Sequence, residues 1–310
     1  MQGWVTRRKA TTVRRRPGDS GAVLFDRGNP RLSDAMIEVE EDSHAPSEVF
    51  VEHAPVFRED RGVVPEDVLE GPPPGGIPRV GVIVPTLNES ENVANLLGRL
   101  NELFPLDMQI VVVDDNSTDG TPHTVHSFRE RFGRVHIIQR TERRGIGSAV
   151  RDGLAHILEN TDSEYVVTMD ADGSHDPRQL PRLLEAARDV DFVQGSRYVA
   201  GGEIVGWPLT RRLLSVLGNN ACRFLFRTGL REHTTFYRVF NRRSARVIAT
   251  VVEDDGYAWG VRSLLAVIRS GLTVREVPIT FADRTYGESK MGTAEVIGWI
   301  ASVARLFLGQ

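Results

Sequence analysis

Short apolar, β-branched stretches alternate along the chain with longer segments that mix apolar and polar residues. The short stretches are residues 80–84, 110–113, 135–138, 165–169 and 192–194. The longer segments are residues 91–103, 121–132, 147–159 and 177–188, which have helical character. Strands that alternate with helices are typical of βαβ units, which form a mainly parallel sheet covered by helices. We therefore predict an α/β fold with the carboxyl ends of its strands along one edge.

Polar residues directly follow four of the five predicted strands. They are Pro85-Thr-Leu-Asn-Glu89, Asp114-Asp-Asn-Ser-Thr-Asp-Gly120, Asp170-Ala-Asp172 and Gly195-Ser-Arg197. In open sheets of this kind, ligands bind just beyond the carboxyl ends of the strands. The sequence therefore predicts a functional site where these carboxylates, amides and the arginine meet.

Asp170 and Asp172 follow the apolar strand at residues 165–169. Residues two apart in an extended segment point the same way, so both carboxylates can face one point beyond the sheet. Mg²⁺ and Mn²⁺ prefer oxygen ligands and keep positions open for substrate phosphates. We therefore favour a metal site at this pair over a solvated turn.

Two further segments have both a functional and a structural interpretation. Asp114 and Asp115 end a buried strand, where a carboxylate can accept hydrogen bonds from a base or ribose, but the residues after them also form a good helix cap. The loop Arg143-Arg-Gly-Ile-Gly-Ser148 precedes a helix whose N-terminus favours phosphate, but a plain tight turn would use the same residues.

The N-terminal quarter of the chain differs in character from the rest. Residues 1–78 have no sustained helical or strand period and end in Gly71-Pro-Pro-Pro-Gly-Gly-Ile-Pro78, a linker composition. We expect residues 1–78 to be mostly disordered, residues 79–295 to form the folded domain and residues 296–310 to form a C-terminal amphipathic helix. The basic cluster Arg14-Arg-Arg16 could contact anionic lipid, but a solvated tail is favoured.

Composition excludes several classes of protein. The 310 residues carry a formal charge of −4, which argues against a protein that coats nucleic acid. The single cysteine, Cys222, excludes an intramolecular disulfide and fits a reducing compartment. No stretch reaches the roughly 18 apolar residues of a spanning helix, and no signal-peptide core follows the basic N-terminus. We expect a cytoplasmic protein that can still work peripherally at the cytoplasmic face of a membrane.

Six motifs in a fixed order resemble the family-2 glycosyltransferases, and within them the dolichyl- and polyprenyl-phosphate mannose synthases. The motifs are Pro85-Thr-Leu-Asn-Glu-Ser-Glu-Asn92, Val113-Asp-Asp-Asn-Ser-Thr-Asp-Gly-Thr121, Gly145-Ile-Gly-Ser-Ala149, Met169-Asp-Ala-Asp-Gly-Ser-His-Asp-Pro177, Gly195-Ser-Arg-Tyr198 and Arg284-Thr-Tyr-Gly-Glu-Ser-Lys-Met291. The resemblance covers residues 79–295 and implies a GT-A, Rossmann-like domain. It also implies Mg²⁺ or Mn²⁺, a nucleotide-sugar donor such as GDP-mannose, and a polyprenyl phosphate acceptor at a membrane surface.

The resemblance assigns roles to individual residues. It implies a donor site formed by Pro85, Leu87, Glu89, Asp114, Asp115, Asp170, Arg284 and Lys290. It places the acceptor phosphate near Arg197, Arg211, Ser215 and Arg238. Asp170 and Asp172 would hold the metal against the donor diphosphate, and Asp172, Arg197 and Arg211 would act in catalysis.

Two positions depart from the family's pattern. Ser174 stands where many members have a glutamine that helps to bind the metal, so we expect water or another group to complete the shell. Phe236, in Glu232-His-Thr-Thr-Phe-Tyr-Arg238, stands where a glycine is usual, so we expect its ring to reshape the acceptor pocket. His233 is expected to make a local polar contact and not to be catalytic.

A lipid phosphate is already anionic and needs arginines to bind it, not a general base. We therefore expect direct displacement with inversion at the sugar's C1. The apolar segments 209–226 and 294–308 could lie at a membrane interface or pack in a core, and the resemblance favours a shallow membrane contact. The sequence identifies no membrane-protein partner.

Four alternatives remain open at this point. The same donor chemistry could serve a non-lipid acceptor, with a base supplied by Glu253-Asp-Asp-Gly-Tyr257. The donor could be a UDP-sugar. A sugar-nucleotide pyrophosphorylase is disfavoured, because its Gly-rich loop is absent after the first strand. A non-catalytic nucleotide-sugar-binding module is disfavoured because Asp170 and Asp172 are present.

Overall fold

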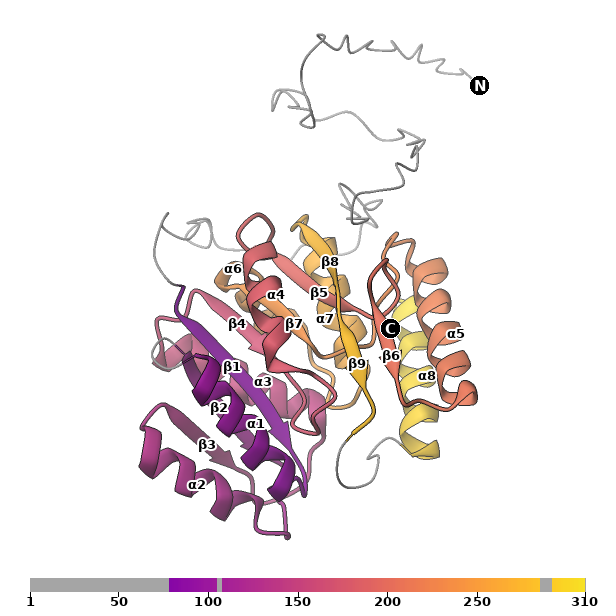
Figure 1. Cartoon of the computed structure of the whole chain (residues 1–310). Helices are drawn as coiled ribbons and strands as arrows, with labels where there is room; N and C mark the ends of the chain where they lie inside the picture. The colour runs from indigo at the N-terminus through magenta and orange to yellow at the C-terminus, as the bar shows by residue number, and fades with distance from the viewer. Residues whose placement is uncertain (1–77, 105–107, 285–291, 310) are drawn as a thin grey trace, which may run out of the picture. The chain divides into compact units, whose positions relative to one another are not determined.

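The computed structural model describes residues 78–104, 108–284 and 292–309, so the predicted tail and Lys290 lie outside the described residues (Figure 1). A seven-stranded sheet has the order β3-β2-β1-β4-β7-β5-β8. Its strands are β1 (Val80–Thr86), β2 (Met108–Asp114), β3 (Val135–Gln139), β4 (Tyr165–Thr168), β5 (Phe192–Ser196), β7 (Arg238–Asn241) and β8 (Val274–Pro278). β7 runs antiparallel to β4 and β5, whereas all other neighbours are parallel. The predicted mainly parallel sheet is confirmed.

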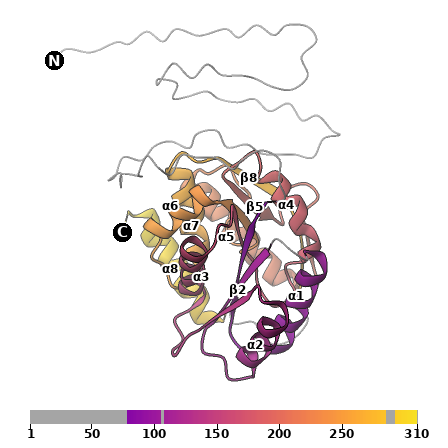
Figure 2. The same ribbon diagram turned by 90° about the vertical axis from the view of Figure 1, so that its left-hand side faces the viewer.

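Helices cover both faces of this sheet, as the turned view shows (Figure 2). One face packs against α1 (Ser90–Leu103), α2 (Thr121–Phe132) and α4 (Leu180–Ala186), which follows the short 3₁₀ helix η2 (Pro177–Gln179). The other face packs against α3 (Ile146–Asn160), α6 (Arg242–Val251) and α7 (Trp259–Arg269). In β1, Val82 and Val84 belong to the core on the α1, α2 and α4 side of the sheet. Ile83 belongs to the core on the α3, α6 and α7 side. Burial on both faces explains why this strand is apolar throughout.

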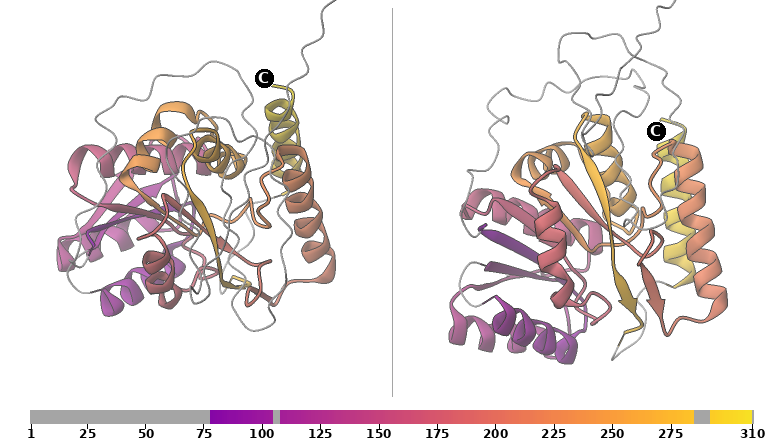
Figure 3. Two further views of the ribbon diagram at one scale, coloured as in Figure 1. Left: turned by 90° about the horizontal axis from the view of Figure 1, so that it is seen from above. Right: turned by 45° about the horizontal axis from the view of Figure 1, so that its top comes forward.

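A second group of elements lies beside α7. β6 (Glu203–Val205) and β9 (Thr280–Ala282) form a two-stranded parallel sheet. The long helices α5 (Leu209–Phe226) and α8 (Thr293–Phe307) lie side by side at one end of the main sheet (Figure 3). Cys222 of α5, Val261 and Leu265 of α7 and Val303 of α8 form a small core that joins these helices.

The outer faces of α5 and α8 are unusually apolar. Most of the large apolar side chains that are exposed in the described part of the chain belong to these two helices. Neither of them, nor any other helix within the described residues, is long and apolar enough to cross a membrane. Both predicted apolar segments are therefore helices, and they share a small buried core while leaving many apolar groups exposed.

Candidate active site

A cavity of about 860 Å³ lies beyond the carboxyl ends of β1, β4 and β5 and continues between α5 and α8. Most of the sequence-predicted site residues line it, namely Pro85, Leu87, Glu89, Asp115, Asp170, Asp172, Arg197, Arg211, Ser215 and Arg284. Asp114 and Arg238 are absent from its lining. The topological rule for open sheets thus locates the cavity correctly.

The carboxylate pair after β4 has the properties of a cation site. Oδ1 of Asp170 is buried and has no hydrogen-bond partner among the described residues. Burial and the neighbouring Asp172 carboxylate raise the pKa of Asp170 to about 8. Oδ2 of Asp172 lies 3.2 Å from the guanidinium of Arg284. Two close carboxylates with one unsatisfied oxygen fit a hard divalent cation, which would supply the positive charge that Asp170 lacks.

Ser174 and His175 hold this pair in place. The Ser174 hydroxyl donates to Oδ1 of Asp172 at 2.6 Å, and it is buried and outside the cavity lining. It therefore orients Asp172, so Ser174 supports a predicted metal ligand. His175 accepts the backbone N–H of Asp170 at Nδ1 (2.9 Å), and its Nε2 lies 3.2 Å from the Thr235 hydroxyl. Burial lowers the pKa of His175 to about 3, so the ring is a neutral tether between two loops.

Asp114 and Asp115 have different roles at the end of β2. Asp114 is fully buried and accepts hydrogen bonds from the Thr86 hydroxyl (3.2 Å) and the Ser117 backbone N–H (2.9 Å). These contacts close the turn that follows β2. Asp114 therefore lies outside the cavity lining, and both of its oxygens serve the loop itself.

Asp115 lines the cavity and is held by three donors. It accepts hydrogen bonds from the Arg140 guanidinium (2.8 Å) and from the backbone N–H groups of Arg144 (2.9 Å) and Gly145 (2.8 Å). Burial would raise the pKa of Asp115, but these donors outweigh it and lower the pKa. Asp115 is therefore an ionised acceptor at the cavity wall. Arg140, which the sequence did not identify, fixes its position.

The glycine loop before α3 is explained by packing. Gly145 has φ +97°. A Cβ added to Gly147 would lie 2.7 Å from the backbone oxygen of Gly256, and Gly147 donates its N–H to the Asp255 carbonyl at 2.9 Å. The small residues therefore let α3 approach the segment at residues 254–256. This contact is sufficient to require glycine here without a bound phosphate.

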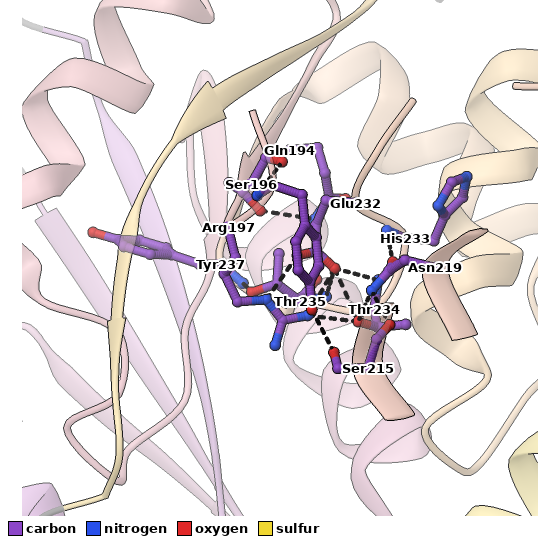
Figure 4. Close-up of polar contacts among 12 residues, drawn as sticks. Gln194, Ser196, Arg197, Ser215, Asn219, Glu232, His233, Thr234, Thr235 and Tyr237 are labelled. Atoms are coloured by element: carbon purple, nitrogen blue, oxygen red, sulfur yellow. Dashed lines mark hydrogen bonds and ion pairs between the residues drawn. The ribbon is translucent and has the colours of Figure 1, made fainter. Parts of the chain in front are cut away.

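Arg197 is fixed by a buried ion pair (Figure 4). Its Nε and Nη2 donate to the two Glu232 oxygens at 2.7 and 2.8 Å, and Nη2 also lies 2.7 Å from the Thr234 hydroxyl. The two charged side chains are 4 % and 0 % exposed. Burial alone would raise the pKa of Glu232, but Arg197 and Thr234 lower it to about 2. The guanidinium therefore stays charged and immobile at the cavity wall.

Arg211 and Ser215 lie one turn apart on α5. Nη1 of Arg211 lies 2.9 Å from Oδ1 of Asp283, and its guanidinium lies 3.9 Å from the centre of the Trp207 ring. Ser215 accepts a hydrogen bond from the Tyr198 hydroxyl at 2.7 Å. Both predicted acceptor contacts therefore face the cavity, on the helix that leads away from the carboxylates.

Arg238 lies outside the cavity lining. It is fully buried, and it donates to the Thr235 carbonyl (2.8 Å), the Ser263 hydroxyl (2.7 Å) and the His233 carbonyl (3.1 Å). These bonds use its guanidinium to support the loop that carries Glu232. The start of β7 directs this side chain into the core, away from the predicted acceptor contacts Arg211 and Ser215 that line the cavity.

His233 and Phe236 lie in the same loop as Arg238. His233 lies 2.8 Å from the Thr228 hydroxyl through Nε2, which confirms a local polar contact. The Phe236 ring is 5 % exposed and stacks on Trp259 at 5.8 Å between ring centres. Phe236 therefore belongs to the core cluster with Trp259 and also lines the cavity.

The cavity becomes apolar along α5. Its lining residues from this helix recur every three or four positions and share one helical face: Arg211, Leu214, Ser215, Leu217, Gly218, Ala221 and Leu225. From α8 it is lined by Glu295 in the first turn and then by the less polar Val296, Trp299, Ile300, Val303 and Ala304. A charged end at Asp170, a middle with arginines and an apolar trough thus form one continuous space.

Comparison with known proteins agrees with this geometry. The sequence profile described as glycosyl transferase family 2 matches residues 81–249. The chain belongs to this family. It is 40 % identical over 228 residues to the undecaprenyl-phosphate mannosyltransferase of Micrococcus luteus, an alignment that covers 73 % of this chain and 93 % of that protein. It is 39 % identical over 221 residues to the polyprenol monophosphomannose synthase of Mycolicibacterium smegmatis, covering 70 % and 83 % of the two chains.

Solved structures support the fold. The glucosyl-3-phosphoglycerate synthase of Mycobacterium tuberculosis, in complex with Mn²⁺, uridine diphosphate and phosphoglyceric acid, superposes with a TM-score of 0.56. The sequences are 16 % identical, and the match covers 75 % of this chain and 78 % of that one. This family-2 chain is therefore a glycosyltransferase with the expected GT-A type of sheet.

Several cavity residues escaped the sequence analysis. They include Trp207, Tyr257, Phe281 and Trp299. Aromatic residues near turns and in apolar helices look like core residues in a sequence. The one available signal was Gly206-Trp207-Pro208, which places an aromatic residue directly before a helix whose first turn carries two arginines.

Proposed function

We propose that this glycosyltransferase transfers mannose from GDP-mannose to a polyprenyl phosphate with inversion at C1. The observation that carries the proposal is the single cavity that joins a carboxylate pair, two wall arginines and an apolar trough. The carboxylates suit a nucleotide-sugar diphosphate, and the trough suits a long hydrocarbon chain. The names of the two relatives support the sugar and the acceptor class.

The proposed reaction is one displacement. An oxygen of the lipid phosphate forms a bond to C1 of the sugar. The bond from C1 to the diphosphate oxygen breaks, and its electron pair leaves with the nucleoside diphosphate. The attacking phosphate is already anionic, so no base has to remove a proton. Arg197 and Arg211 bind and orient that phosphate. Because Nε and Nη2 of Arg197 donate to Glu232, Arg197 offers Nη1, and the guanidinium of Arg211 supplies further donors to the phosphate oxygens.

Asp170 and Asp172 are the residues that would hold Mg²⁺ or Mn²⁺. When bound, a divalent cation offsets the negative charge that develops on a leaving diphosphate. The Mn²⁺ in the distantly similar synthase structure supports this assignment. Arg284 occupies part of the same space by pairing with Asp172, so it has to shift or share this carboxylate when the donor site fills.

We further propose that α5 and α8 rest on the cytoplasmic face of a membrane. Leu209, Leu213 and Phe224 are exposed on α5 beside the cavity-lining face, and Leu217 is exposed at the edge of the cavity itself. α5 contains arginines and no acidic residue, which suits an anionic lipid surface. A lipid acceptor could then enter the trough without leaving the bilayer completely.

This membrane contact yields a prediction. Replacing Leu213 and Phe224 together with glutamate should lower the fraction of protein that floats with anionic liposomes by about tenfold, because two apolar anchors become anionic groups. Both side chains are exposed, at 59 % and 82 %, and neither lines the cavity, so folding should be unaffected. Val251→Glu is the matched control, since Val251 is exposed on α6. Equal flotation of the double variant and the control would refute the membrane contact.

The proposed function is tested by a donor-by-acceptor assay. The purified protein is incubated with Mn²⁺ or Mg²⁺ and labelled GDP-mannose, UDP-glucose or UDP-N-acetylglucosamine, each with and without a polyprenyl phosphate. Lipid-dependent transfer of label from GDP-mannose alone into the organic phase is the expected result. Labelling of the lipid from a UDP-sugar would mean that this sugar nucleotide, and not GDP-mannose, is the donor. Donor hydrolysis without lipid labelling would reject polyprenyl phosphate as the acceptor.

A further inference from the structure

Trp207 occupies a distinctive place in the cavity wall. It lies between β6 and α5, and its half-buried ring meets Phe281 of β9 edge-on, with 5.3 Å between ring centres. Its Nε1 is buried and has no hydrogen-bond partner among the described residues. A buried tryptophan usually places this N–H against an acceptor. The indole is therefore held by contacts with its ring.

Two of those contacts are guanidinium groups. The Arg211 guanidinium lies 3.9 Å from the Trp207 ring centre, and the Arg197 guanidinium lies 5.3 Å from it. Both distances are within the range of a cation–π interaction. The arginines come from separate elements, because Arg197 follows β5 and Arg211 lies in the first turn of α5. The same indole ring thus lies within cation–π range of two positive groups.

The two arginines are restrained unequally by their carboxylates. The Arg197–Glu232 pair is buried and bidentate. The Arg211–Asp283 pair makes one contact, and its side chains are 37 % and 38 % exposed. Partly exposed ion pairs contribute little to stability. An incoming phosphate can therefore replace Asp283, and the Trp207 ring is then the remaining contact that holds Arg211 toward Arg197.

We infer that Trp207 is a positioning residue for the acceptor: its ring holds Arg211 beside Arg197 so that both bind the phosphate of an isoprenyl phosphate. The inference rests on the proposed function and names the residue that organises its acceptor site. The direction of α5 argues for an amphiphilic ligand. Arg211 begins the cavity-facing stripe, and Leu214, Gly218 and Leu225 continue it, so a phosphate at Arg211 leaves its hydrocarbon chain along the trough.

Calorimetry with the full-length protein tests the inference by direct binding. The ligands are farnesyl phosphate, farnesol as the control without phosphate, and GDP as the donor-side control. Trp207→Leu, which keeps apolar bulk but removes the ring face, should raise the Kd for farnesyl phosphate about tenfold. Trp207→Phe keeps a ring face and should raise it only about threefold. Binding of farnesol and GDP should change less than about twofold.

A double-variant cycle shows whether Trp207 acts through Arg211. In an Arg211→Ala background, Trp207→Leu should raise the farnesyl phosphate Kd by less than about twofold, because the group that it positions is gone. A full tenfold effect in that background overturns the inference. So does an equal loss of farnesol or GDP binding, which would mean that the ring only packs.

The outcomes separate this inference from the proposed function. If the wild-type protein binds farnesyl phosphate and Trp207→Leu binds it equally well, the positioning role is rejected and the proposed acceptor stands. If the wild-type protein binds no isoprenyl phosphate, both are rejected. Thermal unfolding of each variant identifies a folding defect. If Trp207→Leu has such a defect, the Kd of Trp207→Phe for farnesyl phosphate is compared with that of the wild type instead. An unchanged Kd then rejects the positioning role.

Discussion

Asp172→Asn is expected to lower the rate of mannosyl transfer by about a thousandfold or more. The substitution keeps the size of the side chain and its hydrogen bond from Ser174, but it removes one of the two negative charges that would hold the divalent cation. Loss of cation stabilisation on a leaving diphosphate costs several kcal/mol, and each 1.36 kcal/mol is about tenfold in rate. Initial rates of lipid labelling and titration of bound Mn²⁺ by electron paramagnetic resonance measure the two effects.

Asp176→Asn is the matched control for this experiment. Asp176 lies four positions further along the same loop and is outside the cavity lining. Its side chain accepts the Arg178 backbone N–H at the start of η2. Asparagine caps a helix about as well as aspartate, so rate and Mn²⁺ affinity should stay close to wild type. If Asp172→Asn retains more than about a tenth of the activity, or binds Mn²⁺ normally, the assigned metal site is wrong.

The position of the cavity could be predicted because it depends on sheet topology. Central strands such as β1 and β2 are buried on both faces, so they appear as continuous apolar runs that end abruptly in polar residues. Parallel strands bring those polar ends together. This reasoning located Asp170, Asp172 and Arg197 at one cavity without any knowledge of the fold's details.

The roles of individual residues were harder to predict, because they depend on which way a side chain turns at the end of a strand. Asp114 and Asp115 are adjacent and chemically identical, yet one closes its own loop and the other lines the cavity. Arg238 begins β7, an antiparallel strand between β4 and β5 that the sequence analysis did not identify. Without that strand, nothing in the sequence shows that the Arg238 side chain points into the core.

The pairing of Arg197 with Glu232 was also hidden, since the two residues lie 35 positions apart. The sequence showed an acid and an arginine in separate motifs, and only Arg197 was a candidate for substrate contact. In the structure, Glu232 fixes the position of Arg197. An arginine that is already neutralised by a buried carboxylate can meet a phosphate without first paying the full desolvation of a free charge.

Arg197→Lys is accordingly expected to impair both stability and catalysis. A lysine keeps the positive charge beside Glu232 but cannot reproduce the two parallel hydrogen bonds. We expect the free energy of unfolding to fall by about 2 kcal/mol, compared with about 3–5 kcal/mol for Arg197→Ala, which leaves Glu232 unpaired. The kcat/KM for polyprenyl phosphate should fall about a hundredfold, because Arg197 can bind Glu232 through Nε and Nη2 and still offer Nη1 to the phosphate, whereas one ammonium group cannot do both in a fixed geometry.

Arg275→Lys provides the control for replacing a buried arginine. Arg275 lies on β8 and pairs with Asp189 at 3.3 Å, remote from the cavity lining. Denaturant unfolding and steady-state kinetics, with rates normalised to folded protein, separate the two effects of Arg197→Lys. A stability loss with unchanged kcat/KM for the lipid would make Arg197 a structural residue, whose charge serves Glu232 alone. If kcat/KM for the lipid falls while donor hydrolysis without lipid is unchanged, Arg197 acts at the acceptor phosphate. Arg197 would then have two roles, because it would both stabilise the fold and bind the acceptor.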